Sequence, residues 1–368
     1  MKPVYVLGRT RGALSHLVTQ ELASLPEQPS VPRIVYLLRS DRELRSFLNH
    51  DSTLTIRDYS LSRAVDVSQV QLMSACAPPQ YDSGELAHIE SMMCSFKKPR
   101  DVTELQRYKG CFTKESSLLL LDGDKSFSDS LRKLVWRDKF TRPQLYQCLS
   151  DIRTWSSTNF ESGVVGDGSL RVAKIPRDLK DLDSYEYDLG ANLSQEGELI
   201  DMLSRTRRLN TTFMKYTDFV HVQYEHMIVK TAIGAYTALF DCTNGELLKM
   251  KHTPTLLKNL INECLKVIAT ADPAAFRAPN SRVVLDSDRI LDVAVTMMKM
   301  MNKESTLLRR QVALWNNTEL TNTTGYFTYH ARQHKVHCLH LNMIHKILEA
   351  KTSLASLRYQ KVSYDDTF

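Results

Sequence analysis

The sequence predicts an α/β domain over residues 1–197, followed by an all-helical domain over residues 198–368. One observation is length, because 368 residues exceed the roughly 100–200 that form a typical domain. The other is pattern. Apolar runs typical of strands alternate with helical stretches in the first half, whereas helical periodicity prevails from about Gly197 onward. A composition of 42% hydrophobic and 24% charged residues is that of a globular chain.

The chain opens with a strand, a glycine-containing turn and a helix. Val4 to Leu7 is a short apolar run typical of a buried strand, Gly8 to Gly12 forms the turn, and apolar residues then recur at helical spacing from Leu14 to Leu22. The run from Ile34 to Leu38 predicts a second, parallel strand, because the intervening residues suffice for a crossover connection. Further strands are predicted at 54–56, 65–72, 118–121, 145–149 and 170–175, with a helix at 128–136.

The second half reads as a succession of helices. Pro254 follows Thr253 at the expected start of one helix, where the missing N–H of a proline costs little. Another helix carries an apolar stripe from Ile290 to Met301 that includes Met297 and Met298. We interpret these methionines as adaptable core filling, with a flexible binding face as the alternative.

Composition limits the classes of function. No apolar run approaches the roughly 20 residues that a membrane-spanning helix needs. The seven cysteines include no CxxC pair, which indicates a reducing compartment rather than a disulfide framework. A net charge of +6 permits binding to nucleic acid or to an anionic surface without requiring it.

The start of the chain is poor in acidic residues. Glu21 is the first acid, and Lys2, Arg9 and Arg11 precede it, which is typical of mitochondrial targeting segments. Because a strand is predicted from Val4 onward, we expect any targeting information to be internal or uncleaved.

The turn after the first strand partly matches a dinucleotide-binding motif, GxGxxG/A, which brings the N–H groups of a helix close to a pyrophosphate. Gly8 and Ala13 match its first and third positions, but Thr10 stands at the second, where a glycine lets the phosphate approach. Arg39 follows the second strand, where an arginine receives the 2′-phosphate of NADP; a solvated helix start is the alternative. The first domain is therefore predicted to be Rossmann-like, with these four residues as candidates for cofactor binding.

Histidines near the end of the chain suggest a metal hypothesis. His330 and His334 are four positions apart on a predicted helix, and imidazole suits zinc; His337, Cys338 and His340 follow. The alternative for His334 is a place at a helix C-terminus, where a cation complements the helix dipole, and we expect no metal site.

Basic residues interleaved with aromatic ones predict an RNA or ribosome contact. Phosphates bind favourably to clustered cations, and exposed rings can stack on unpaired bases. The alternative is a solvated surface, which is what most charge runs are. A second basic run, Lys97 to Arg100, lacks such rings. The candidates are Arg132, Lys133, Trp136, Arg137, Lys139 and Arg142.

Two regions of the helical half carry a family resemblance. One is the stretch 229–248, which contains Thr237-Ala238-Leu239 and then Asn244-Gly245-Glu246-Leu247; the other comprises 305–308, 318–320 and 325–326. They resemble the helix with the catalytic lysine, the NGEL loop and the substrate region of the ketopantoate reductase family. The resemblance implies a Rossmann-like first domain and a helical second domain of the 6-phosphogluconate dehydrogenase C-terminal type.

This resemblance also places the family's functional residues. His226 stands at the position of the catalytic lysine, Lys230 and Gly234 stand at those of two asparagines, and Glu319 matches a functional glutamate. The family's HNG turn corresponds to Leu121-Asp122-Gly123, where a carboxylate replaces the amide. A lysine is charged at pH 7, whereas a histidine of ordinary pKa mostly is not, so the group that protonates the alkoxide is altered. We expect no catalytic residues; if the chain is active, Glu319, His226 and Lys230 are the candidates.

Four further stretches carry a closer resemblance within the family: 22–32, 47–52, 73–79 and 84–90. They resemble the fungal mitochondrial translational activators of cytochrome b mRNA, a branch of the reductase fold without catalysis. This implies a mitochondrial matrix protein, peripheral to the inner membrane. The implied partners are the mitochondrial ribosome, the leader of the cytochrome b messenger RNA and other translational activators.

The sequence thus leaves two hypotheses of function. One is a non-catalytic translation factor that requires no cofactor, with NADPH as a vestigial ligand. The alternative is an NADPH-dependent 2-dehydropantoate (ketopantoate) reductase, or a related 2-oxo-acid reductase.

Overall fold

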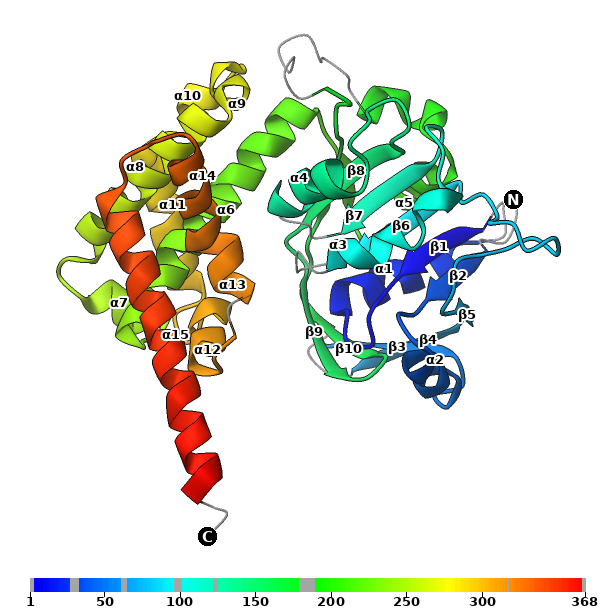
Figure 1. Ribbon diagram of the computed structural model, residues 1–368, viewed down its shortest axis with the longest axis horizontal. Helices are drawn as coiled ribbons and strands as arrows, with labels where there is room; N and C mark the ends of the chain where they lie inside the picture. The colour runs from blue at the N-terminus through cyan, green and yellow to red at the C-terminus, as the bar shows by residue number, and fades with distance from the viewer. Residues whose placement is uncertain are drawn as a thin grey trace. The chain divides into compact units, whose positions relative to one another are not determined.

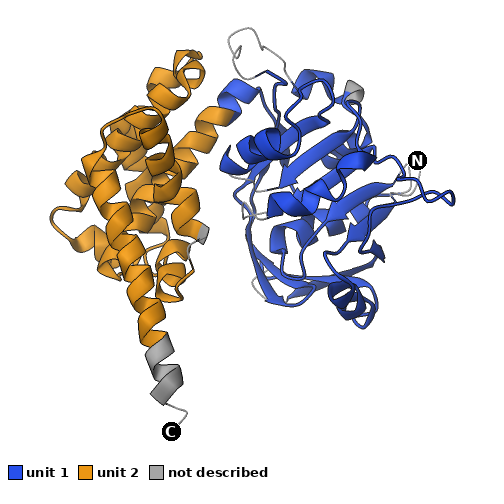
Figure 2. Cartoon of the chain, viewed as in Figure 1, with its two compact units in different colours: residues 1–179, 185–219 blue, residues 180–184, 220–368 orange. Residues whose placement is uncertain are grey.

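The computed structural model describes residues 3–26, 33–60, 65–95, 101–121, 125–178, 189–316 and 318–365. Described residues up to 178 and those from 189 to 219 form one compact unit, and residues from 220 onward form a second (Figure 2). The first unit contains two β-sheets with helices packed on them, and the second consists of helices (Figure 1). The predicted fold class, an α/β domain followed by an all-helical domain, is therefore confirmed.

The main sheet of the first unit has eight strands. In spatial order they are β12 (Thr211–Phe213), β11 (Leu170–Lys174), β8 (Gln144–Ser150), β7 (Ser117–Leu121), β6 (Ser91–Ser95), β1 (Val4–Leu7), β2 (Ile34–Leu37) and β5 (Met73–Ala75). From β8 to β5 all neighbours are parallel, whereas β11 runs antiparallel to β8. Strands of a parallel sheet are covered on both faces, and β6 and β7 are accordingly buried along their whole length.

A second, smaller sheet lies on the other side of the first helix. Its order is β4 (Asp66–Gln71), β3 (Thr53–Asp58), β10 (Glu161–Val165) and β9 (Arg153–Thr158). β9 and β10 form an antiparallel hairpin, and β10 pairs with β3 in parallel. The helix α1 (Ala13–Ala23) contacts strands of both sheets and buries its apolar residues between them. This sandwich holds the glycine turn that precedes α1.

The apolar runs predicted as strands all lie in strands. Those at 54–56 and 65–72, however, belong to the small sheet rather than to the main one. The hairpin of β9 and β10 was not predicted because its sequence is mostly polar, and β6 was missed because Met92, Met93 and Cys94 are not strong strand formers. The remaining helices of this unit are α2 (Asp41–Leu48), α3 (Asp101–Gln106), α4 (Lys125–Leu134) and α5 (Glu198–Arg205).

The first unit extends beyond Gly197, where the sequence pattern places the start of the second domain. Helix α5 buries Leu199, Ile200 and Leu203 in the core of the first unit, and β12 pairs in parallel with β11. A helical pattern does not indicate on which domain the helix packs. In the structure, the boundary between the two units lies near residue 219.

The second unit is organised around the long helix α6 (Tyr216–Phe240), most of which is buried. Thr253 occupies the first position of α8 rather than capping it, because the helix begins one residue earlier than the cap pattern predicts. Among the described residues, no helix is long and apolar enough to cross a membrane. The other helices are α7 (Asn244–Lys249), α8 (Thr253–Ala271), α9 (Pro273–Arg277), α10 (Ser281–Val284), α11 (Ser287–Met300), α12 (Leu307–Ala313), α13 (Thr318–Leu320), α14 (Tyr326–Gln333) and α15 (Leu339–Asp365), with a π-helical turn at Thr321–Gly325.

His16, fully buried in α1, ties three elements of the first unit together. Its Nδ1 lies 2.8 Å from Ser162 Oγ of β10, and its Nε2 lies 2.8 Å from the carbonyl oxygen of Arg9 in the glycine turn. Burial lowers the pKa of His16 from 6.5 to about 4. The imidazole is therefore neutral in the folded protein at physiological pH.

The burial of His16 predicts a loss of stability in acid. The unfolded chain binds a proton near pH 6.5, but the folded chain binds it only near pH 4. The neutral imidazole of His16 therefore makes its full contribution to the free energy of unfolding above pH 6.5. About 3 kcal/mol of this free energy is lost as the pH falls to 4. Urea unfolding at several pH values should show a flatter pH dependence for His16→Gln than for the wild type. The exposed His337→Gln serves as the control and should keep the wild-type slope.

Candidate functional site

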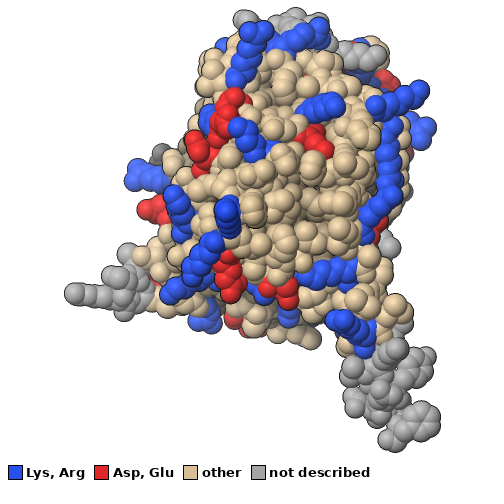
Figure 3. All heavy atoms as spheres, turned by 90° about the vertical axis from the view of Figure 1, so that its left-hand side faces the viewer, with Lys and Arg blue, Asp and Glu red and all other residues tan. Residues whose placement is uncertain are grey.

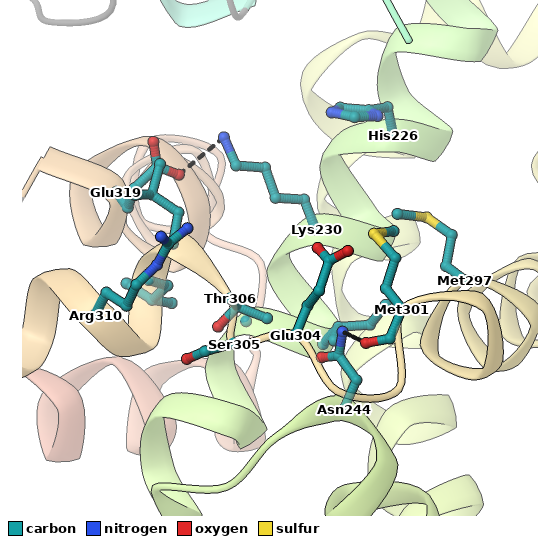
Figure 4. Close-up of a pocket in the computed structure, with 14 residues that line it drawn as sticks. His226, Lys230, Asn244, Met297, Met301, Glu304, Ser305, Thr306, Arg310 and Glu319 are labelled. Carbon is teal, nitrogen blue, oxygen red and sulfur yellow. Dashed lines mark hydrogen bonds and ion pairs between the residues drawn. The ribbon is translucent and has the colours of Figure 1, made fainter. Parts of the chain in front are cut away.

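A cavity of about 310 Å³ opens within the helical unit (Figure 4). Its wall comes from α6, from the start of α7, from the end of α11 and from the segment that leads into α12 and α13. Charged side chains from several of these elements reach the cavity. An apolar wall with a few polar groups is typical of a site for a small molecule. The charged and imidazole residues are His226, Lys230, Glu304, Arg310 and Glu319.

An ion pair spans this cavity. Lys230 Nζ of α6 lies 2.8 Å from Glu319 Oε2 of α13 (Figure 4). The glutamate side chain is only 5% exposed and the lysine side chain 33%. The backbone N–H of Glu319 also donates to the side-chain oxygen of Gln311, at 2.9 Å. A carboxylate that is withdrawn from water needs such a cation, so Lys230 is already engaged by the protein.

His226 lies one helical turn before Lys230 on α6, and both side chains border the cavity (Figure 4). The structure thus brings together Glu319, His226 and Lys230, the candidates for an active enzyme. The third position, Gly234, packs against Leu308 of α12, whose Cβ lies 3.4 Å from the place of an added Cβ. Gly234 itself borders the cavity but has no side chain to offer a ligand.

The conspicuous Asn244-Gly245-Glu246 stretch has a structural role. The Asn244 side chain donates to the carbonyl oxygen of Met301 at 3.0 Å, and the Gly245 N–H donates to that of Asn302 at 2.8 Å. Glu246 and Thr243 form a reciprocal capping box at the start of α7. These contacts fix the segment after α11, which forms one wall of the cavity.

The methionine stripe of α11 divides between the two predicted roles. Met298 is fully buried in the core, as core filling predicts. Met297 and Met301 border the cavity instead, where their flexible side chains shape its apolar wall (Figure 4).

The glycine turn of the first unit is held by the protein's own side chains. A Cβ at Gly8 would overlap the ring of the buried Tyr36, whose hydroxyl donates to the Arg9 carbonyl oxygen at 3.0 Å. The carbonyl oxygen of Thr10 accepts from the Phe160 N–H at 2.8 Å. Gly8 therefore makes room for Tyr36, a requirement that the sequence motif did not reveal.

Arg39 does not stand open as a receptor for a 2′-phosphate. Its guanidinium lies 3.4 Å from Asp101, and Arg9 donates to the same carboxylate at 2.9 Å. Asp101 is buried, with 5% of its side chain exposed. A phosphate bound at Arg39 would meet this carboxylate, so the residues present do not fit the 2′-phosphate of NADPH.

The start of α1 fits a phosphate better. Its N-cap, Gly12, offers no side-chain cap, and Ala13 begins the helix. Both border a cavity of about 230 Å³ together with Arg9 and Arg11. Uncapped N–H groups and nearby guanidinium groups suit an anion. The Asp122 and Gly123 positions of the family's HNG turn lie outside the described residues.

The structure corrects two of the predicted RNA-contact residues. Trp136 is 2% exposed and packs edge-on against Phe112, so its ring cannot stack on a base. Arg142 is 4% exposed and donates to the carbonyl oxygen of Arg177.

The other predicted RNA-contact residues lie nearer to solvent. Lys133, Arg137 and Lys139 are exposed and Arg132 is half-buried; Lys139 pairs with Asp178 at 3.1 Å. The basic run at 97–100 lies outside the described residues. On the face of the helical unit drawn in Figure 3, lysines and arginines are dispersed among acidic and uncharged residues rather than gathered in one patch.

The histidines near the end of the chain contact other side chains. His330 stacks on His334 with ring centroids 6.1 Å apart, and its ring is tilted against that of Tyr326 at 4.5 Å. His340 Nδ1 lies 3.1 Å from Glu263. Within the described ranges, no group of three or more histidine, cysteine or acidic side chains is arranged to hold a metal ion.

A Rossmann-like sheet with a glycine turn before its first helix, followed by a helical unit with a charged cavity, defines a two-domain dehydrogenase architecture. Residues 218–352 match the family model described as "Ketopantoate reductase PanE/ApbA C terminal". The helical unit therefore resembles the C-terminal domain of the ketopantoate reductases, and the predicted resemblance is confirmed.

Comparison with known proteins supports both parts of this assignment. The chain is 26% identical to the cytochrome B translational activator CBS2 of Saccharomyces cerevisiae, over 95% of each chain. It is 24% identical to a probable 2-dehydropantoate 2-reductase of Schizosaccharomyces pombe, over 88% of this chain and 89% of the relative. Among solved structures, the fold resembles a D-mandelate dehydrogenase with NADH and anilino(oxo)acetate at a TM-score of 0.69 and 14% identity, over 96% of this chain and 100% of that one. A ketopantoate reductase of Ralstonia eutropha gives 0.69 at 13% identity, with the same coverage.

The Lys230–Glu319 contact predicts strong coupling between the two positions. Lys230→Met leaves the Glu319 carboxylate withdrawn from water without this cation, so we expect a loss of about 2 kcal/mol of unfolding free energy. The double variant Lys230→Met/Glu319→Gln removes both charges and should recover at least about 1 kcal/mol of it. Urea unfolding of the wild type, both single variants and the double variant measures this; additive losses would contradict the coupling.

The placement of Trp136 predicts a core effect rather than a binding effect. Trp136→Ala should cost about 3–5 kcal/mol of unfolding free energy, because it empties a buried site. The nearby Phe140 is 74% exposed, so Phe140→Ala should stay within about 0.5 kcal/mol of the wild type. Similar unfolding midpoints for the two variants would show that Trp136 is not in the core.

Proposed function

We propose that this chain acts in mitochondria as a translational activator of cytochrome b mRNA, without reductase turnover. The observation that carries the proposal is the similarity to the yeast translational activator, which extends over 95% of both chains and therefore includes both units. At 26% identity the similarity is comparable in strength to that with the reductases, so the chemistry of the cavity has to decide between the two.

The cavity chemistry supports the absence of turnover. Reduction of a 2-oxo acid needs a cation that polarises the carbonyl and gives a proton to the developing alkoxide. At the position of the family's lysine this chain carries His226. The nearby ammonium of Lys230 is 2.8 Å from the buried Glu319, so its charge is already balanced by the protein. An anionic substrate would have to displace that carboxylate.

A second candidate function is the NADPH-dependent reduction of ketopantoate or a related 2-oxo acid. The Lys230–Glu319 contact also favours it, because an ammonium next to a carboxylate in a cavity of about 310 Å³ can act as a proton donor. In that case Lys230 replaces the family's lysine one helical turn further along α6. The family resemblance to a probable 2-dehydropantoate 2-reductase is in keeping with this alternative.

The proposed role includes location and partners. We place the protein in the mitochondrial matrix, peripheral to the inner membrane, with the mitochondrial ribosome, the leader of the cytochrome b mRNA and other translational activators as partners. No cofactor is required for this role. The start of α1 suits a phosphate of a vestigial nucleotide ligand, whereas Arg39, paired with Asp101, offers no site for the 2′-phosphate that distinguishes NADPH.

Mitochondrial translation measured in the organism that carries this chain tests the activator role. Deletion of the gene should abolish synthesis of cytochrome b in pulse-labelled mitochondria, and the other mitochondrial products should continue to be made. The Lys230→Met/Glu319→Gln variant should restore cytochrome b synthesis as well as the wild type does, because the role uses no reductase chemistry. Normal cytochrome b synthesis in the deletion strain would contradict the proposal.

An enzyme assay tests the absence of turnover directly. Purified chain with NADPH and ketopantoate should oxidise NADPH no faster than the buffer, while the 2-dehydropantoate 2-reductase of Saccharomyces cerevisiae serves as the active control. Turnover at an ordinary enzymatic rate that Lys230→Met abolishes would favour the reductase instead.

A further inference from the structure

The outer face of the small sheet carries a pair of exposed aromatic rings. Tyr59, directly after β3, is 41% exposed, and Trp155 of β9 is 42% exposed. Their ring centroids lie 5.2 Å apart with the ring planes tilted by 36°. Two large rings that lie side by side and remain partly exposed offer a contiguous contact surface for a ligand.

The strand register explains how the rings are presented. Gly163 of β10 pairs with Trp155 on one side and with Arg57 of β3 on the other, so these three residues share one face. A Cβ at Gly163 would overlap the indole ring. The missing side chain therefore lets the indole lie against the sheet, with part of its surface facing solvent.

Cationic side chains alternate with these rings. Arg57 precedes Tyr59 by two residues on the β3 side, and Arg153 precedes Trp155 by two residues on β9, so each strand contributes one guanidinium and one ring to the same face. Glu161, 3.8 Å from Arg57, is an acidic residue of this face.

The cavity at the start of α1 reaches β9, an edge strand of the small sheet, and brings arginine side chains close to it. Trp155 borders this cavity together with Arg9 and Arg11. The other face of the small sheet is packed on α1, so the side that carries the rings is the one available to a ligand.

We propose that this face, defined by Arg57, Tyr59, Arg153 and Trp155, binds single-stranded RNA. Unpaired bases stack on exposed aromatic rings, and their phosphates require nearby cations; both are present here within two residues of each other. β4 adds the exposed Gln69 and Gln71 to this face, and also the exposed Val67, which pairs with Arg57. The guanidinium groups beside the rings favour a polyanion over an apolar protein partner. The inference rests on the proposed role at an mRNA, and it names a contact surface for that role.

Fluorescence anisotropy with a labelled twelve-nucleotide oligouridylate tests the proposal on the full chain. Trp155→Ala and Tyr59→Ala should each weaken binding about tenfold, because each removes one stacking ring. Arg57→Ala/Arg153→Ala should weaken binding and reduce the slope of log affinity against log salt by about 1. Tyr81→Ala, which removes an exposed ring elsewhere on the same unit, is the matched control and should bind like the wild type.

A duplex of the same length is the second control, and it should bind at least about tenfold more weakly, since paired bases offer no free faces for stacking. Equal affinity of Trp155→Ala and the wild type for the oligouridylate overturns the proposal. So does a Trp155→Ala variant that binds RNA normally but no longer co-sediments with ribosomes, which would assign the face to a protein partner.

The binding result is separable from the proposed function. If deletion of the gene leaves cytochrome b synthesis intact while Trp155→Ala loses RNA affinity, the translational role fails and the RNA site stands. If deletion abolishes cytochrome b synthesis while all four substitutions leave RNA affinity unchanged, the role stands and this site is wrong.

Discussion

Charges withdrawn from water must find partners, and in this protein the partners are other side chains of the chain itself. Asp101 in the first unit and Glu319 in the second each have about 5% of their side chain exposed. The first holds Arg9 and Arg39, and the second holds Lys230. Removing one partner of such a pair costs far more than the pair contributes, so these contacts fix the local structure around both cavities.

These ion pairs also limit the chemistry of the two cavities that correspond to the reductase sites. In a reductase, the cations of the active site stabilise the charge that develops on the substrate in the transition state, so they must be available to the substrate. Here the guanidinium after β2 and the ammonium on α6 are balanced before any ligand arrives. The backbone of the glycine turn is occupied in a similar way, because the Arg9 carbonyl oxygen takes contacts from both Tyr36 and His16. The scaffold is retained by internal contacts that do not depend on a cofactor.

The motif residues His226, Lys230 and Glu319 border the cavity, but other conspicuous stretches of the sequence serve mainly the structure. The Asn244-Gly245-Glu246 stretch stands out in the sequence, yet its side chains cap α7 and bind the segment after α11. The hairpin of β9 and β10 is unremarkable in sequence and carries no family motif. It nevertheless supplies Ser162 to the buried His16 on one face and Trp155 to solvent on the other. Alternation along a strand separates these two roles without any signal in composition.

The sequence by itself determined the type of the strongly patterned elements, because the spacing of apolar residues is a local property, but it did not reveal β6, β9 and β10. It located the first βαβ unit, the change to helices and the residues Glu319, His226 and Lys230 that border one cavity. Only the tertiary structure decided that Trp136 is core, that Tyr36 fills the space at Gly8, that α5 belongs to the first unit and that Arg39 meets Asp101. Each of these depends on which distant residue lies opposite, and the periodicity of a single segment contains no information about its partner.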